Sequence, residues 1–402
     1  MKRVTVSLLI VLCFFPILAR PIIVHAENDL IVENVVVDYI FADSLKISAT
    51  IPDSSKLSKV FLILSADNQQ TRQVPLEIGK NDQVQITYDL RTGGFVPYSR
   101  IYYWFEGEFN SGGVVNSPSY WFDYMDNRFI WESNQSNLFT IFWVDGDAAY
   151  GQKIQQIART GLENATRILP VAPEIPIEIY VYPDESSLQE VLSLNSKNWV
   201  NGHSFVGFNR LLVAKKAPLS DLTDLERVIP HELMHLLEYQ ITGDKYTNTP
   251  AWLLEGLATQ AEQYPNPDQK RALNDALANK SLTALSTLCN GISKDANQAV
   301  VDYAHSTAVV DFVQKNFGNQ VFLKMLDNSI SGLDCDRNVI TSLGISLQQL
   351  DSNWRNSLSP NSSMTSSLST SSLLWIAIPI IFLLSGAFIL VWRQRNRKKQ
   401  QG

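Results

Sequence analysis

The chain of 402 residues has only five histidines and three cysteines, and charged residues make up 18% of it. Its 33 Lys and Arg are outnumbered by 40 Asp and Glu, which leaves a net charge of −7. A nucleic-acid-binding protein needs a basic surface, so this balance excludes nucleic acid as an expected partner. The hydrophobic content of 45% excludes a wholly disordered chain and suffices for two or three domains with their own cores.

Both ends of the chain carry patterns typical of targeting and membrane insertion. Lys2 and Arg3 precede an apolar run that ends at Leu18, and residues 1–26 are predicted to be a secretory signal peptide. An uncleaved anchor is the alternative. Residues 373–392 contain no charge, and this uncharged segment is long enough for one transmembrane helix. The basic residues of 393–402 predict a cytoplasmic tail. We therefore expect a single-pass membrane protein with its N-terminal bulk outside the cell.

The cysteines leave one question open. Cys13 lies in the predicted signal peptide, so Cys289 and Cys335 are the two that remain in the mature chain. An even number in an oxidising compartment is compatible with a disulfide, but two free buried thiols fit the sequence equally well.

Residues 27–128 are predicted to form an immunoglobulin-like β-sandwich, because short Val-, Ile-, Tyr- and Phe-rich runs alternate with turn residues. None of its residues indicates chemistry. The expected strands are 31–41, 45–51, 59–66, 83–90, 100–109 and 120–124.

Residues 129–357 have the pattern of an α+β domain, with a mixed sheet followed by helices. A Ser- and Thr-rich linker, 358–372, separates this domain from the predicted membrane helix. Strands are expected at 138–144, 175–181 and 204–214, and helices at 148–169, 186–194, 222–241, 251–264, 267–278, 297–317, 319–327 and 346–356.

The strongest chemical signal is the sequence His231-Glu232-Leu233-Met234-His235. On a helix, the two imidazoles four residues apart lie on one face and can bind one metal ion. Glu232 lies beside them, where it can act as the general base toward a metal-activated water. Pro230 directly precedes the motif, so the helix either kinks or restarts at that point.

Catalytic zinc takes three protein ligands and keeps one position open. No third histidine follows closely, because residues 236–247 contain none. Glu255 in the segment Trp252-Leu-Leu-Glu-Gly-Leu-Ala258 is the expected third ligand. A helix stop at Thr242-Gly243 and a helix start at Thr249-Pro250, with Thr249 as the cap, predict a second helix that returns Glu255 to the first.

The two motifs together resemble the gluzincin branch of zinc metallopeptidases, and most closely the peptidase MA-like domain of secreted and membrane-anchored bacterial proteins. The resemblance covers about residues 130–357. It implies a zincin-like fold, Zn²⁺ as the cofactor, His231, His235 and Glu255 as its ligands and Glu232 as the catalytic base. It also implies an edge strand that pairs with extended substrate, for which residues 204–214 are the matching segment.

Two departures from related enzymes narrow the expected activity. The G-x-M-E-N motif by which exopeptidase gluzincins hold a free amino terminus is absent, which favours an endopeptidase over an aminopeptidase. Thr259 stands where thermolysin relatives have an Asp that supports a zinc-bound histidine.

Stabilisation of the oxyanion needs a further donor. Relatives use a Tyr or His from a later helix, and Tyr303 and His305 are the two candidates here. Glu238 and Glu262 are candidates to support the zinc ligands, with a solvated surface carboxylate as the alternative for each. His203, just before the expected edge strand, is either a substrate contact or a surface histidine.

The sequence thus predicts a membrane-anchored, extracytoplasmic zinc metallopeptidase that acts on a peptide or protein. An inactive zinc-binding surface protein, in which the β domain binds or adheres, is the alternative. Hydrolysis of a non-peptide amide would use the same zinc chemistry. Neither the oligomeric state nor the substrate specificity can be derived from the sequence.

Overall fold

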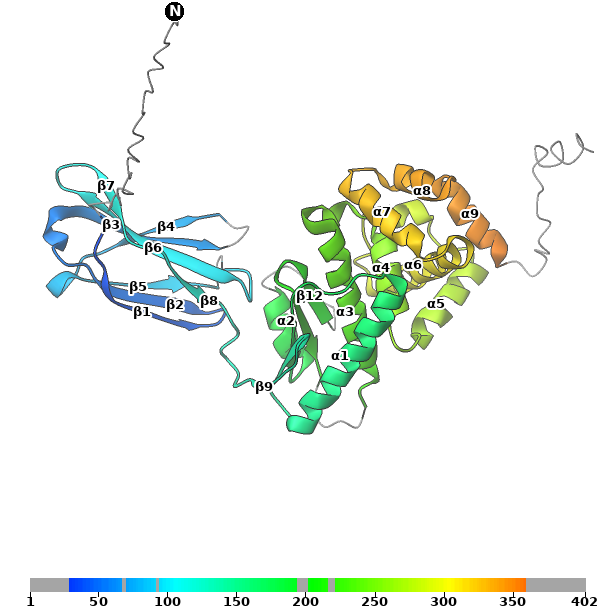
Figure 1. Cartoon of the computed structure of the whole chain (residues 1–402), viewed down its shortest axis with the longest axis horizontal. Helices are drawn as coiled ribbons and strands as arrows, with labels where there is room; N and C mark the ends of the chain where they lie inside the picture. Colours follow the sequence, from blue (N-terminus) through cyan, green and yellow to red (C-terminus); the bar gives the residue numbers. More distant parts are fainter. Residues whose placement is uncertain (1–28, 67–69, 92–93, 194–201, 216–220, 359–402) are drawn as a thin grey trace, which may run out of the picture. The chain divides into compact units, whose positions relative to one another are not determined.

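The computed structural model describes residues 29–66, 70–91, 94–193, 202–215 and 221–358 (Figure 1). The predicted signal peptide, membrane helix and basic tail lie outside these residues, as does the predicted linker beyond Leu358. Within the part of the chain that the structure describes, no helix combines the length and apolar character needed to cross a membrane. The chain divides into two compact units, Met1–Gly161 with Pro173–Leu236, and Leu162–Ala172 with Leu237–Gly402.

Two antiparallel sheets form the N-terminal part of the first unit. One has the order β1-β2-β5, and the other has the order β4-β3-β6-β7 with β8 also paired to β6. Buried and outward residues alternate along β6, which buries Ile101, Tyr103 and Phe105 in a core shared with Leu45 and Ile47 of β2. The strands are β1 (Glu33–Ile40), β2 (Ser44–Thr50), β3 (Leu57–Ala66), β4 (Arg72–Leu76), β5 (Gln83–Asp89), β6 (Arg100–Phe109), β7 (Val114–Asn116) and β8 (Tyr120–Asp123).

The six strands predicted for this region are confirmed, and two more are present that the sequence did not reveal. β4 contains Pro75, which lacks a backbone N–H, and its place at the edge of the sheet tolerates this loss. β7 has only three residues, which is too short for an alternating pattern to stand out. The immunoglobulin-like character of the region stays a prediction.

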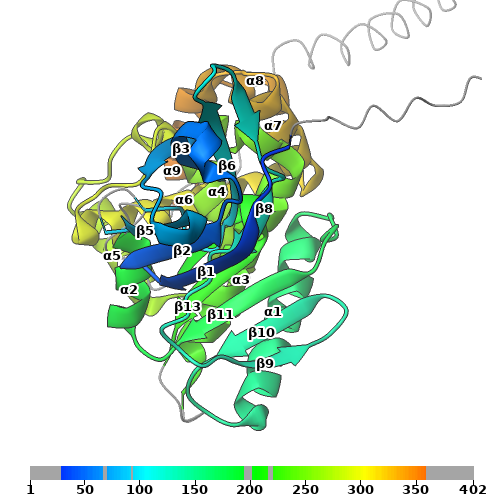
Figure 2. The same cartoon turned by 90° about the vertical axis from the view of Figure 1, so that its left-hand side faces the viewer.

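A third sheet, which is mixed, belongs to the same unit and has the order β12-β13-β11-β10-β9. β10, β11 and β13 run parallel to one another, and the two outer strands are antiparallel to their neighbours. Figure 2 shows β13, β11, β10 and β9 in this order. The bounds are β9 (Glu132–Gln135), β10 (Phe139–Trp143), α1 (Ala148–Ile168), β11 (Ile177–Tyr182), α2 (Glu185–Ser193), β12 (Gly202–Phe205), η3 (Val206–Phe208) and β13 (Arg210–Ala214). This arrangement confirms the mixed α+β class.

The prediction of one strand over residues 204–214 is wrong, because this segment forms a hairpin. β12 and β13 pair antiparallel across the short η3 turn, and Asn209 closes the turn in the left-handed conformation with φ 54°. The edge of the sheet is therefore β12, which contains His203, while β13 is an inner strand.

The core of the N-terminal sheets continues into the mixed sheet. Tyr180 and Tyr182 of β11 and Leu188 of α2 belong to the same buried cluster as the sandwich residues. The Tyr98 and Tyr182 hydroxyls are 2.5 Å apart, and the Tyr182 hydroxyl donates to Asp126 at 3.0 Å. This buried hydrogen-bond chain fixes the segment that leads from the first two sheets to β9.

Helices make up the rest of the described chain. All six predicted between residues 222 and 356 are present, and α8 is an additional one. They are α3 (Thr223–Thr242), η4 (Gly243–Asn248), α4 (Ala251–Ala261), α5 (Pro267–Ala278), η5 (Leu285–Cys289), α6 (Ala296–Phe317), α7 (Gln320–Ile330), α8 (Cys335–Leu343) and α9 (Leu347–Ser357).

Candidate metal centre

Helix α3 carries the two predicted imidazole ligands on one face. The His231 and His235 ring centroids are 5.0 Å apart, as expected for residues four apart on a helix. His231 is half-buried and His235 is 8% exposed. The rest of this part of the helix is apolar and buried, including Ile229, Leu233 and Met234. Such a wall lowers the local dielectric and keeps bulk water away from the imidazoles.

Pro230 lies inside α3, which continues through it from Thr223 to Thr242. A proline in this position removes one backbone hydrogen bond and needs room for its ring. Gly161 of α1 supplies that room: a Cβ on this glycine would lie 2.8 Å from Pro230 Cγ. The helix therefore does not restart at the metal motif.

Helix α4 carries Glu255, which is half-buried. The predicted start at Thr249-Pro250 is correct within a residue, but the predicted cap is wrong. Pro250 occupies the cap position, and the Thr249 hydroxyl, buried within the described part of the chain, has no hydrogen-bond partner there. The extended conformation of Pro250 with ψ 130° begins the helix without a side-chain cap.

The three predicted metal ligands come together. His231, His235 and Glu255 each offer one donor atom, and these atoms all lie within 4.8 Å of one another. A tetrahedral ion with ligand bonds of about 2.1 Å would hold its donors roughly 3.4 Å apart, so small side-chain rotations suffice. Two imidazole nitrogens and one carboxylate oxygen are a donor set that suits zinc and leaves a coordination position open.

Glu232 lies next to the edge strand. It is 8% exposed, and a Cβ on Gly202 of β12 would lie 3.4 Å from both its Cγ and its Oε1. The same Cβ would lie 2.2 Å from Val228 Cγ1, so only glycine lets β12 approach α3 this closely. The sequence did not predict this contact between β12 and the Glu232 carboxylate. The isolated Gly202 was its local sign.

A second glycine explains part of the Trp252–Ala258 motif. A Cβ on Gly256 would lie 2.4 Å from Val310 Cγ2 and 2.7 Å from the backbone oxygen of Ser306, both in α6. Gly256 thus permits a close approach of α4 to α6, directly beside Glu255. A glycine within an otherwise buried apolar helix was the signal that could have indicated this packing.

Tyr303 and His305 do not share a face of α6. Successive helical residues are about 100° apart, which separates these two side chains by roughly 200°. His305 is fully buried; its ring stacks on Trp354 with centroids 4.7 Å apart, and its Nε2 lies 3.7 Å from Asp351 Oδ1. Tyr303 is half-buried. Among the described residues, His305 does not belong to the cluster of three donors, and the roles of both residues stay predictions.

The candidate supporting residues have different environments. Glu238 is fully buried, so the reading of it as a solvated surface carboxylate is wrong. Glu262 is half-buried and forms the C-terminal cap of α4. His203 is half-buried on β12, with its ring edge-to-face against Phe205 at 4.9 Å. The functional roles of Glu238, Glu262 and His203 stay predictions.

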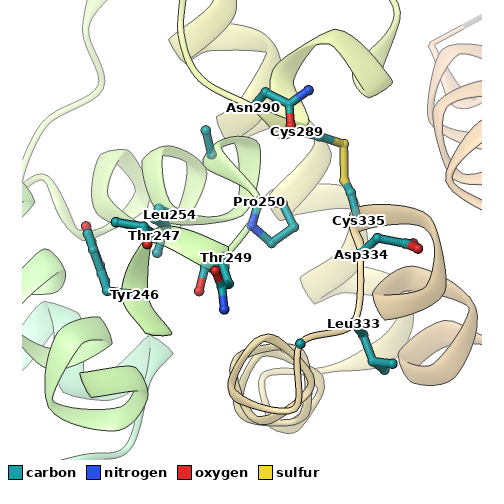
Figure 3. Close-up of a pocket in the computed structure, with 13 residues that line it drawn as sticks. Tyr246, Thr247, Thr249, Pro250, Leu254, Cys289, Asn290, Leu333, Asp334 and Cys335 are labelled. Atoms are coloured by element: carbon teal, nitrogen blue, oxygen red, sulfur yellow. A yellow bond between two sulfur atoms is a disulfide. The ribbon is translucent and has the colours of Figure 1, made fainter. Parts of the chain in front are cut away.

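Cys289 and Cys335 form a disulfide with their Cα atoms 6.0 Å apart, which answers the question that the sequence left open. The bond joins the end of η5 to the start of α8. It borders a cavity of about 580 Å³ whose opposite wall is the start of α4, including Pro250 and Leu254 (Figure 3). The disulfide therefore stiffens the surroundings of the helix that carries Glu255.

A sequence model described as the peptidase MA superfamily matches residues 157–360. The matched region is just over half of the chain and contains both α3 and α4. A comparison with curated proteins found no match.

Three solved structures have weak overall likenesses to this chain. A mutant M1 zinc metallopeptidase from Deinococcus radiodurans has a TM-score of 0.34 and 13% identity, over 77% of this chain and 89% of that one. A β-1,3-glucan-binding domain of carbohydrate-binding module family 56 has a TM-score of 0.17 and 11% identity, over 22% and 94%. A purple acid phosphatase from yellow lupin seeds has a TM-score of 0.22 and 10% identity, over 39% and 30%. These scores are too low to support any inference.

Proposed function

The chain belongs to the peptidase MA superfamily, and we propose that it is a membrane-anchored, extracytoplasmic zinc metallopeptidase that cleaves internal peptide bonds. The observation that supports this most strongly is the convergence of His231, His235 and Glu255 within 4.8 Å, next to the buried carboxylate of Glu232. A purely structural zinc site needs four protein ligands. Three donors beside a carboxylate are the combination expected of a hydrolytic site.

Each of these residues has a distinct proposed role. His231, His235 and Glu255 would hold zinc, which when bound supplies Lewis-acid polarisation of the scissile carbonyl and of the attacking water. Glu232 takes a proton from that water and delivers it to the leaving amine. Tyr303 is our candidate donor to the oxyanion. We leave His305 out of the mechanism, because its ring is fully buried against Trp354.

The edge strand supports cleavage within a chain rather than at its end. β12 is the outermost strand of the mixed sheet, and an extended peptide can add to such an edge through backbone hydrogen bonds. Gly202 brings this edge into contact with Glu232. A peptide paired along β12 would therefore run past the general base, with residues continuing on both sides of the scissile bond.

The proposed location rests on two features of the sequence and one of the structure. The predicted signal peptide at 1–26 and the predicted membrane helix at 373–392 support a position of the described domains outside the cell. The Cys289–Cys335 disulfide supports this side of the membrane, because disulfides persist in oxidising compartments.

The proposal is tested with the whole chain purified in detergent, stripped of metal and reloaded with zinc. Incubation with a peptide library should yield internal cleavage products by mass spectrometry, only after zinc is restored, and a hydroxamate inhibitor should abolish them. If the zinc-loaded protein leaves every peptide intact, the proposal fails and the inactive zinc-binding surface protein becomes the better account.

A further inference from the structure

Aromatic side chains gather on the outward face of the β4-β3-β6-β7 sheet. Buried residues alternate with half-buried ones along β6, so Tyr102 and Trp104 point away from the core while Tyr103 points into it. Trp121 of β8 is 54% exposed, and Phe61 of β3 is half-buried. We call the surface formed by Phe61, Tyr102, Trp104 and Trp121 the aromatic face.

Strand register places these rings beside one another. Tyr102 pairs directly with Trp121, and Trp104 pairs with Ile63. Phe61 lies two residues from Ile63 on β3, which makes it a diagonal neighbour of Trp104. Neighbouring side chains on a sheet cover one another's edges, while the surface that faces solvent stays open. This explains why three of the four rings are half-buried. The rings form one continuous strip across β3, β6 and β8.

Polar contacts hold the strip in place before any ligand arrives. The Arg100 guanidinium lies 3.8 Å from the centroid of the Trp121 ring, and it pairs with Asp123 at 2.9 Å. Gln73 donates its amide N–H to Glu106 at 2.9 Å at the other end of the face. A platform held this way loses little conformational entropy on binding.

The charges around the aromatic face largely cancel. Arg100 pairs with Asp123, and Lys59 pairs with Glu108 at 2.9 Å. Glu106 is hydrogen-bonded to a neutral amide, so the local excess is negative. A nucleic acid or an anionic membrane requires cations that are free to meet phosphates. Here both cations, Arg100 and Lys59, are paired with carboxylates of the protein itself. The surroundings of the aromatic face therefore suit an uncharged partner.

We propose that the aromatic face binds an uncharged polysaccharide. The pyranose rings of such a chain expose C–H groups on their flat sides, and packing these against Tyr102, Trp104 and Trp121 removes apolar area from water. The hydroxyl groups project from the ring edges, where the Gln73 amide and the Glu106 carboxylate can exchange hydrogen bonds with them. This binding does not depend on peptide hydrolysis.

Retention on insoluble polysaccharide tests the proposal. The whole chain in detergent is mixed with suspensions of cellulose, chitin and xylan, and the unbound fraction gives the dissociation constant for each. We expect wild type to bind at least one of them. Trp121→Ala should weaken that binding about ten- to a hundredfold, because Trp121 has the most exposed ring of the aromatic face. Ile40→Ala, at a 58% exposed position of the other sheet, is the matched control and should bind like wild type.

Further variants guard against loss of fold. Circular dichroism should show the same spectrum for each variant as for wild type. Trp121→Phe keeps a ring at this position and should bind with intermediate affinity, and Tyr102→Ala should weaken binding about tenfold. Retention of wild type on none of the three polysaccharides would overturn the proposal. So would unchanged binding by Trp121→Ala and Tyr102→Ala, or displacement of the protein from the polysaccharide by heparin or by anionic vesicles.

Discussion

Substitution of Gly256 by alanine should disturb the metal centre through helix packing alone. The new Cβ would lie 2.4 Å from Val310 Cγ2 and 2.7 Å from Ser306 O, whereas ordinary contacts begin near 3.4 Å. Val310 can rotate, but the Ser306 oxygen belongs to the backbone of α6, so α4 and α6 must separate by roughly 1 Å. Overpacking of this kind costs about 1–3 kcal/mol, and the better helix propensity of alanine returns up to about 1 kcal/mol.

The expected net loss of stability is therefore about 1–2 kcal/mol, measured as a lower denaturant midpoint. Because Glu255 directly precedes Gly256 on α4, the displacement also moves the third metal donor. Zinc affinity, measured by competition with a chromophoric chelator, should fall, and kcat/KM for peptide cleavage should fall about a hundredfold. Gly151→Ala is the matched control. Its Cβ would clash with the Trp143 ring at 2.3 Å and should lower stability with zinc affinity unchanged. Wild-type zinc affinity in Gly256→Ala would refute this reasoning.

Two further predictions concern the helices that surround the site. Replacement of Cys289 by serine opens a loop closed over 46 residues and should lower the free energy of unfolding by about 4 kcal/mol, a loss that added reductant should reproduce in wild type. Burial alone would raise the pKa of the Asp351 carboxyl, but His305, Arg355 and the Leu285 N–H outweigh it and lower that pKa from 3.8 to about 2. Because the folded pKa lies below the unfolded one, this group contributes about 2 kcal/mol above pH 4 that is lost as the pH falls from about 4 to 2. Asp351→Asn should remove this part of the acid dependence of the unfolding free energy, and an unchanged acid profile would contradict the assignment.

The metal cluster could be predicted from sequence because its chemistry is local. The spacing of His231 and His235 fixes their common face as soon as the segment is helical, and zinc then requires one more donor. Glu255 was the available carboxylate on the next helix, and a helix stop and a helix start lie between them. The strands followed from Val-, Ile-, Tyr- and Phe-rich runs between turn residues, and most helices followed from a period of 3.6 residues.

The remaining features depend on contacts between segments distant in sequence. Whether Pro230 ends a helix is decided by Gly161 in α1, which leaves space for the proline ring. The left-handed conformation of Asn209 divides residues 204–214 into two strands. The conformation of one residue leaves no periodic pattern in the sequence. Glu238 is fully buried and His305 packs against Trp354 of α9, and no local pattern in the sequence indicates either environment.

The central claim is that Glu232 acts as the base of a zinc hydrolase, and Glu232→Gln tests it most directly. The variant should bind zinc with the affinity of wild type, because Glu232 is not among the three donors, and its kcat/KM should fall about a hundred- to ten-thousandfold. Glu226→Gln, on the first turn of the same helix, should change neither quantity. Peptide cleavage by zinc-loaded Glu232→Gln at the rate of wild type would contradict the account.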